Sequence, residues 1–121
     1  MVQNSNTAGY YSHLRIARQH ARRSNHPQFH LAALILRGGN IVSIGWNKDH
    51  LHAEHTALNR AWRSDVDGST LLVVRVKKSG VFGMARPCPS CMQRIRAAGI
   101  KKVTYTNESG ILETIRPTMG N

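Results

Sequence analysis

Apolar residues recur at helical spacing in three parts of the chain, and each part predicts a helix. The first helix is expected over residues 10–23, the second over residues 53–62, and the third from Pro89 to Gly99. Proline suits the first position of a helix, because its missing N–H group would have no partner there. Glycine suits the position just after a helix end. All three segments are amphipathic and therefore predict helices that pack on another layer.

Short apolar runs bounded by turn residues predict strands between these helices. The expected strands cover residues 30–36, 40–46, 70–76, 103–106 and 111–115. The pair Gly38-Gly39 is typical of a hairpin turn between the first two strands. The third run is apolar except for Arg75, as in a central strand covered on both faces. Only four residues separate the last two strands, too few for a parallel crossover, so these strands should pair antiparallel.

This order of elements predicts one α/β domain over residues 1–121, with helices covering a mixed five-stranded sheet. A chain of this length is too short for two separate cores. Residues 1–9 and 117–121 are expected to be flexible ends. No apolar run is long enough to cross a bilayer, and the polar residues 1–12 do not resemble a secretory signal. We therefore expect a cytoplasmic protein with no membrane partner.

The charge of the chain is strongly unbalanced, with 17 Lys and Arg residues against six Asp and Glu, a net charge of +11. Basic residues fill two blocks, residues 1–48 and 68–102, that contain no acidic residue. Solubility alone does not require one sign to dominate. The imbalance favours an anionic partner, such as a nucleotide phosphate or a polynucleotide.

Two segments place metal-binding side chain types at predicted helix starts: His52-Ala53-Glu54 and Pro87-Cys88-Pro89-Ser90-Cys91. The partial positive charge of a helix N-terminus stabilises thiolates, which are the form of cysteine that binds metal. His52, Cys88 and Cys91 would supply three ligands. Catalytic zinc sites use three protein ligands and keep the fourth position for water. Glu54 would face that position as a proton carrier.

Together, H-x-E and P-C-x-x-C resemble the signature of the zinc-dependent cytidine and deoxycytidylate deaminase superfamily. The resemblance covers residues 28–115 and implies a three-layer α/β/α sandwich, commonly assembled into dimers or tetramers. It implies that Zn²⁺ on His52, Cys88 and Cys91 activates a water for attack on C4 of cytosine. Glu54 would carry the proton of that water to ring N3 and then help to protonate the departing amine.

The resemblance also implies substrate contacts. Asn47 looks like the asparagine with which the family binds the sugar or the base, and the backbone N–H of Ala53 would contact the base. Arg86 lies next to the cysteine motif and is a candidate phosphate contact. Phe29 and Phe82 would either stack on a base or pack in the core.

The branch of the superfamily is left open by two features. Histidine at position 52 is typical of members that act on nucleotides, tRNA or polynucleotides, whereas nucleoside deaminases mostly have cysteine there. The antiparallel final hairpin instead resembles the nucleoside branch and some bacterial toxin deaminases.

The expected function is hydrolytic deamination of cytosine to uracil in a (deoxy)cytidine nucleoside or nucleotide, with release of ammonia. One alternative is a deaminase of single-stranded DNA or RNA, and another is a non-enzymatic, basic nucleic-acid-binding protein with a structural zinc.

Other interpretations of single residues compete with these. Cys88 and Cys91 alone would fit a thioredoxin-like redox pair, which leaves His52 and Glu54 without a role. A structural zinc would take His55 as its fourth ligand. Among the remaining residues, Arg15, Arg18 and Arg22 are expected on a solvated helix face, and Trp46 and Trp62 in the core or at a subunit contact.

Overall fold

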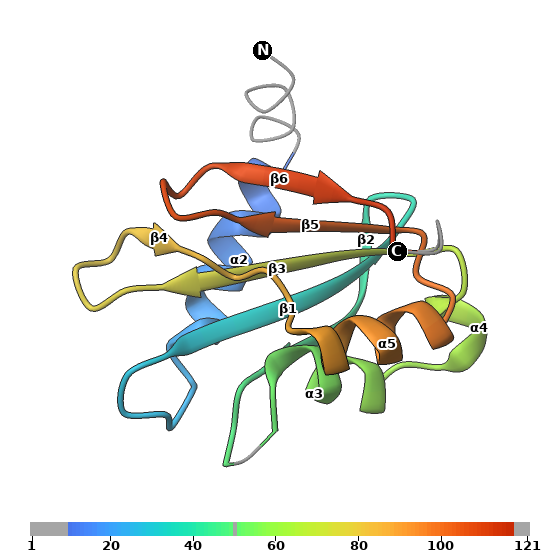
Figure 1. Ribbon diagram of the computed structural model, residues 1–121, viewed down its shortest axis with the longest axis horizontal. Helices are drawn as coiled ribbons and strands as arrows, with labels where there is room; N and C mark the ends of the chain where they lie inside the picture. The colour runs from blue at the N-terminus through green and yellow to red at the C-terminus, as the bar shows by residue number, and fades with distance from the viewer. Residues whose placement is uncertain (1–9, 50, 118–121) are drawn as a thin grey trace.

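The computed structural model describes residues 10–49 and 51–117, which form one sheet with helices on both faces (Figure 1). The strands are β1 (His30–Arg37), β2 (Asn40–Trp46), β3 (Thr70–Val76), β4 (Phe82–Gly83), β5 (Lys102–Thr106) and β6 (Leu112–Ile115). The helices are α2 (Tyr11–Ala21), α3 (Ala53–Asn59), α4 (Arg63–Val66) and α5 (Pro89–Ala97). Within the described residues, no helix has both the length and the apolar character needed to span a bilayer.

The sheet has the strand order β2-β1-β3-β5-β6. β1 pairs antiparallel with both β2 and β3, and β3 pairs parallel with β5. β5 and β6 pair antiparallel, as the short connection between them predicts. The two-residue strand β4 adds a sixth member, which pairs with the end of β3 and was not expected from the sequence. Two residues are too few to produce a periodic pattern.

Three layers are present, as the superfamily resemblance implies. α2 packs on one face of the sheet, where its buried residues join a core with Leu34, Leu72 and Val74. α3 and α5 cover the other face over Ile35, Leu71 and Val73 (Figure 1). The alternation of side chains along β1 and β3 supplies both cores. β3 lies between β1 and β5, which explains why nearly all of its residues are apolar.

The second helix is shorter than expected, because α3 ends at Asn59 and a separate turn, α4, follows. Two backbone hydrogen bonds that span three residues, from Arg60 to Ala57 and from Ala61 to Leu58, both 3.3 Å long, close the last turn of α3. Trp62 then lies outside any core with 80% of its surface exposed, so the expectation of a core position is wrong for this residue. The alternative, a subunit contact, stays a prediction.

Contacts near α2 and at the chain end also modify the expectations. Arg15 and Arg22 are exposed, as expected, but Arg18 is half-buried, stacks on the ring of Phe82 at 4.4 Å and donates to the carbonyl of Gly80. Of the flexible ends expected at residues 1–9 and 117–121, residues 1–9 and 118–121 lie outside the described residues. Pro117 is buried and its carbonyl accepts a hydrogen bond from Arg96 Nε at 2.6 Å, so the loose tail does not begin there.

Candidate functional site

The starts of α3 and α5 meet on one side of the sheet (Figure 1). His52 is the extended residue immediately before α3, and Cys88 holds the same position before α5. Pro89 is the first residue of α5, as its missing N–H predicts, and Cys91 follows in the first turn. Two helix N-termini therefore direct their free N–H groups and partial positive charge toward the same region.

α3 is fixed against β2 by direct backbone contact at Gly45. A Cβ atom on this residue would lie 2.3 Å from the backbone nitrogen of Ala57 and 2.6 Å from the carbonyl oxygen of Ala53. Ser43 on the same strand donates a hydrogen bond from its hydroxyl to the carbonyl of Ala57 at 2.7 Å. Only glycine permits this approach, which sets the position of the helix start that carries the metal-ligand candidate His52.

The three expected metal ligands converge. His52 Nδ1 lies 3.1 Å from Cys91 Sγ and 4.0 Å from Cys88 Sγ, and all three donor atoms lie within 4.8 Å of one another. Tetrahedral zinc with ordinary Zn–S and Zn–N bonds needs N···S separations of about 3.6 Å, between the two found here. The donor set of two sulfurs and one imidazole nitrogen fits zinc by its chemistry as well as by its spacing.

In the metal-free protein the pKa values of the two thiols are shifted in opposite directions. A hydrogen bond with the hydroxyl of Ser90 and one with the backbone of Cys91 lower the pKa of Cys88 to about 7. Burial, followed by the charge of the Glu54 carboxylate, raises the pKa of Cys91 to about 12. One sulfur is thus readily available as a thiolate, whereas the other thiol loses its proton when a cation compensates the charge.

Glu54 is almost fully buried, with 3% of its surface exposed, and it lies on the wall of a cavity beside the three donors. Burial raises the pKa of this carboxyl, while a backbone hydrogen bond and the charge of His52 oppose the rise. A buried carboxyl with a raised pKa accepts a proton more readily than an exposed one and can return it during a reaction. This placement agrees with the expected role of Glu54 as a proton carrier.

His55 approaches one of the three donors but does not complete a group of four. Its Nε2 lies 3.7 Å from Cys91 Sγ, and its ring stacks against that of His52 with 5.8 Å between the centroids. Among the described residues, the one group of three or more donor atoms that all lie within 4.8 Å of one another is His52, Cys88 and Cys91. Three ligands are typical of catalytic zinc, whereas structural zinc has four. A thioredoxin-like redox pair would need only the two cysteines, and it would not explain why the His52 imidazole approaches both sulfurs.

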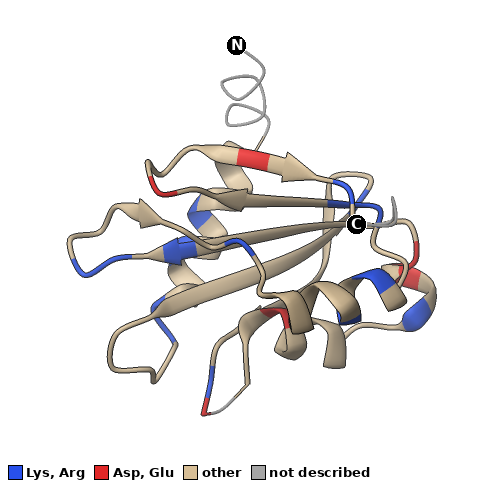
Figure 2. Cartoon of the chain, viewed as in Figure 1, with Lys and Arg blue, Asp and Glu red and all other residues tan. Residues whose placement is uncertain are grey.

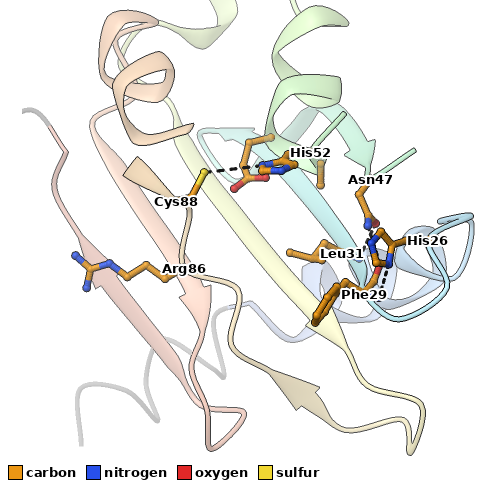
Figure 3. A pocket seen from close by; sticks show the side chains of 9 residues that line it. His26, Phe29, Leu31, Asn47, His52, Arg86 and Cys88 are labelled. Carbon is orange, nitrogen blue, oxygen red and sulfur yellow. Dashed lines mark hydrogen bonds between the residues drawn. The ribbon is translucent and has the colours of Figure 1, made fainter. Parts of the chain in front are cut away.

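The cavity next to the donors has a volume of about 250 Å³. Figure 3 shows its lining, with the zinc-ligand candidates at one end and the residues before and in β1 at the other. The lining residues are His26, Phe29, Leu31, Asn47, His52, Ala53, Glu54, Arg86 and Cys88. The sequence motifs identify six of them, and Phe29 is one of the two residues predicted either to stack on a base or to pack in the core. A cavity of this size suits a small ligand such as a pyrimidine ring with its sugar.

Asn47 joins two walls of the cavity. Its Oδ1 accepts a hydrogen bond from the backbone N–H of Leu31 at 2.9 Å, and its Nδ2 donates to the carbonyl of Phe29 at 2.6 Å. Much of the hydrogen-bonding capacity of Asn47 is used to hold the start of β1 against the end of β2. One amide hydrogen remains, so the contact with substrate stays a prediction.

The loop before β1 contributes His26, which the sequence analysis did not select as a site residue. His26 Nδ1 accepts hydrogen bonds from the backbone N–H groups of Gln28 and Phe29 at 3.0 and 2.9 Å. Because Nδ1 accepts in both, the ring proton belongs on Nε2. Asn25 and Asp49 pair side chain to side chain at 3.1 Å and tie this loop to the one after β2. No sequence pattern links these loops, which meet only in the folded chain.

Arg86 is exposed, and Figure 3 shows its side chain extending away from His52, toward β5 and β6. Its guanidinium carbon lies 5.9 Å from the centre of the Tyr105 ring. The charge at the cavity wall is thus directed outward in this arrangement. A phosphate contact from Arg86 stays a prediction.

Comparison with protein families matches residues 9–107 to the cytidine and deoxycytidylate deaminase zinc-binding region. A search among curated proteins finds no match.

Solved structures with the same fold include the dCMP deaminase of the cyanophage S-TIM5. Its apo form is 28% identical with a TM-score of 0.63, over 82% of each chain. Its complex with dCMP and dUMP is 26% identical with a TM-score of 0.62, over 81% of this chain and 80% of that one. RibD of Acinetobacter baumannii is 20% identical with a TM-score of 0.65, over 84% of this chain but 29% of its own, and shares the fold.

Proposed function

The chain belongs to the cytidine and deoxycytidylate deaminase family, and from this premise we propose that it hydrolyses the cytosine amino group of a free (deoxy)cytidine nucleoside or nucleotide. The products are the corresponding uracil compound and ammonia. The observation that carries this proposal is the convergence of His52, Cys88 and Cys91 next to a cavity into which the buried carboxyl of Glu54 faces.

His52, Cys88 and Cys91 would hold the zinc ion of the family, which supplies a water of lowered pKa as the nucleophile. The oxygen of that water would form a bond to C4 of the ring, while Glu54 accepts one proton of the water and delivers it to N3. The C4–N4 bond would then break. Ammonia would leave with the second proton of the same water, carried to it by Glu54, and the oxygen would remain on C4 as the uracil carbonyl. Because burial favours the protonated carboxyl, Glu54 can hold this proton between the two transfers.

Other cavity residues orient the base. The backbone N–H of Ala53 is one of the free groups of the α3 N-terminus and can donate to the ring carbonyl. Phe29 lies at the opposite end of the cavity and offers an aromatic face to the pyrimidine. Asn47 holds that end in shape through its two backbone partners.

A mononucleotide or nucleoside is favoured over a polynucleotide by the surroundings of the cavity. The phage relative, a dCMP deaminase of similar length, binds dCMP and dUMP. Single-strand binders use several aromatic platforms along the strand. Among the described residues, the exposed aromatic side chains are Tyr11, Phe29 and Trp62, and only Phe29 lines the cavity. The net charge of +11 supports the polynucleotide alternative, which the following experiment separates.

The test compares zinc-loaded wild type with Glu54→Gln on a panel of cytidine, deoxycytidine, dCMP, dCTP, single-stranded DNA and tRNA. Deamination is followed by the mass of the product and by released ammonia. The matched control is Glu108→Gln, which makes the same change at an exposed turn. We expect Glu54→Gln to lose about 10²- to 10⁴-fold in kcat with zinc content unchanged, and the control to remain active.

Each outcome is informative. Deamination of nucleosides or nucleotides by the wild type, lost in Glu54→Gln, supports the proposal. Reaction of oligonucleotides alone would replace it with the polynucleotide alternative. Full activity of zinc-loaded Glu54→Gln would remove the proton carrier from the mechanism.

A further inference from the structure

One edge of the sheet gathers basic side chains around a single indole ring. Trp46 is the last residue of β2, the edge strand, and its side chain is partly buried. The ring of His20, on α2, stacks on it with 5.6 Å between the centroids. The guanidinium carbons of Arg23 and Arg60 lie 4.5 and 5.4 Å from the centre of the same ring. These four residues are called the Trp46 cluster below.

The cluster brings together segments from both helix layers. Trp46 is paired with Ala32 of β1, whose side chain belongs to the core on the α2 side, and residues opposite one another in a sheet project to the same face. Arg23 follows the end of α2 on that side. Arg60 follows the end of α3, which covers the other side, and its side chain passes around the edge strand to reach the ring. The two arginines therefore converge only in the folded chain.

The charges of the two arginines have no carboxylate partner. Neither guanidinium makes a hydrogen bond or an ion pair with residues 10–49 or 51–117. Residues 1–48 contain no acidic residue, and Figure 2 shows none on α2 or β2. Asp49 is the acidic residue nearest to Trp46 in the sequence, and its carboxylate accepts a hydrogen bond from the side-chain amide of Asn25 instead. The protein thus leaves this positive charge uncompensated.

The two guanidinium charges also act on His20. Burial first, and then the charges of Arg23 and Arg60, lower the pKa of this imidazole. Its Nδ1 is buried and has no hydrogen-bond partner in the described part of the chain. The partial negative charge of a helix C-terminus favours each arginine separately. It does not explain why both lie on one ring, where they repel each other and disfavour the protonation of a third group.

We infer that the Trp46 cluster binds a phosphate group, supplied by a nucleic acid backbone or by a free phosphate compound. Guanidinium groups donate pairs of hydrogen bonds to phosphate oxygens, and an anion that contacts both of them offsets their mutual repulsion. Arg22 and Lys48 are exposed and flank the cluster in the sequence, so they add to the positive field. None of the four cluster residues lines the cavity beside the metal-ligand candidates. The site is therefore separate from the proposed reaction.

The experiment measures the binding of two probes to the zinc-loaded protein by calorimetry. The probes are inorganic phosphate and a thymidine octanucleotide, whose bases carry no amino group that could be removed. The double variant Arg23→Gln, Arg60→Gln is compared with the control Arg15→Gln, Arg116→Gln, which removes two exposed arginines elsewhere and changes the net charge equally. We expect the first variant to bind at least about 10-fold more weakly than wild type, and the control to stay within about 3-fold.

Three readouts connect the bound phosphate with the cluster. Trp62→Phe leaves Trp46 as the one tryptophan of the chain, and its emission should change as a probe binds. The pKa of His20, followed by NMR, should rise when the octanucleotide binds, because the anion offsets the charges of Arg23 and Arg60. Added salt should weaken octanucleotide binding, and the slope of log affinity against log salt should be smaller by about 1.4 in the cluster variant than in wild type.

The two probes separate the sources of the phosphate. Binding of the octanucleotide alone, lost in the cluster variant, assigns the site to a nucleic acid backbone. Binding of inorganic phosphate that is lost in the same variant assigns it to a free phosphate compound. A wild type that binds neither probe overturns the inference, as does equal binding by the cluster and control variants. Binding that leaves the emission of Trp46 and the pKa of His20 unchanged also overturns it and reduces the arginines to a cover for the indole.

Discussion

The contact between Gly45 and α3 offers a direct test of how the fold positions the metal-ligand candidates. In Gly45→Ala, the new Cβ would lie 2.3 Å from the backbone nitrogen of Ala57 and 2.6 Å from the carbonyl oxygen of Ala53. Both neighbours are backbone atoms of α3 and cannot turn aside as a side chain could. Since a relaxed contact needs roughly 3.5 Å, the helix must move away from β2 by about 1 Å.

The size of the effect follows from this displacement. Overpacking of this kind costs about 1–3 kcal/mol of the free energy of unfolding, which is about 4 to 12 °C in Tm for a domain of this size. His52 and Glu54 lie at the start of the displaced helix. Functional groups must be held within about 0.5 Å of their productive positions, so zinc affinity and kcat/KM should each fall roughly 10- to 100-fold.

The assay combines thermal melting of the metal-free protein with competition for zinc against a chelator of known affinity. Gly83→Ala is the matched control, because its new Cβ would meet Lys77 Cε at 2.7 Å. Lys77 is exposed, and the end of its flexible side chain can move aside. The control should therefore stay close to wild type in zinc affinity. Wild-type zinc affinity and Tm in Gly45→Ala would refute the claim that this backbone contact sets the metal-binding geometry.

Two further predictions concern zinc and pH. Removal of zinc by a chelator should lower Tm. Free zinc at a thousand times its Kd should restore about 4 kcal/mol of the free energy of unfolding, or roughly 15 °C in Tm, whereas the Tm of His52→Ala should change little with zinc. Equal shifts of Tm in both proteins would contradict the assigned donors. Burial, then the charges of Arg23 and Arg60, lower the pKa of His20, whose ring stacks on Trp46 with 5.6 Å between the centroids. The folded protein therefore binds a proton on His20 less readily than the unfolded chain does. The contribution of His20 to stability is present above its ordinary pKa near 6.5. It is lost as the pH falls from that value toward the lowered pKa of the folded state. The Tm of His20→Gln should therefore fall less than that of wild type between pH 7 and pH 5. Parallel curves of Tm against pH for the two proteins would contradict this.

Features that depend on near neighbours along the chain were predictable. The strands over residues 40–46 and 70–76 have the expected bounds, and α5 begins at Pro89. The last two strands pair antiparallel because a four-residue connection permits nothing else. The donor types in His52-Ala53-Glu54 and Pro87-Cys88-Pro89-Ser90-Cys91 indicated zinc chemistry, since each motif stands where a helix N-terminus favours it.

Features that depend on packing between distant segments were not predictable. The helical spacing of residues 53–62 continues beyond the point where α3 ends, and nothing local marks Trp62 as exposed. Arg18 belongs to a regular basic stripe, yet Gly80 in the loop after β3 and Phe82 in β4 partly cover it. For Arg18, an element far along the chain decides burial.

The sequence by itself determined the donor types and the layered α/β architecture, because each follows from local periodicity, turn length or side chain chemistry, and its two motifs together indicated the deaminase family. Only the tertiary structure decided that His26 and Phe29 close the cavity, that Asn47 joins its walls, and that the guanidinium of Arg75 lies against Phe29. Burial and the supply of hydrogen-bond partners are properties of the packed chain, since they depend on residues that meet only when the sheet and its loops assemble.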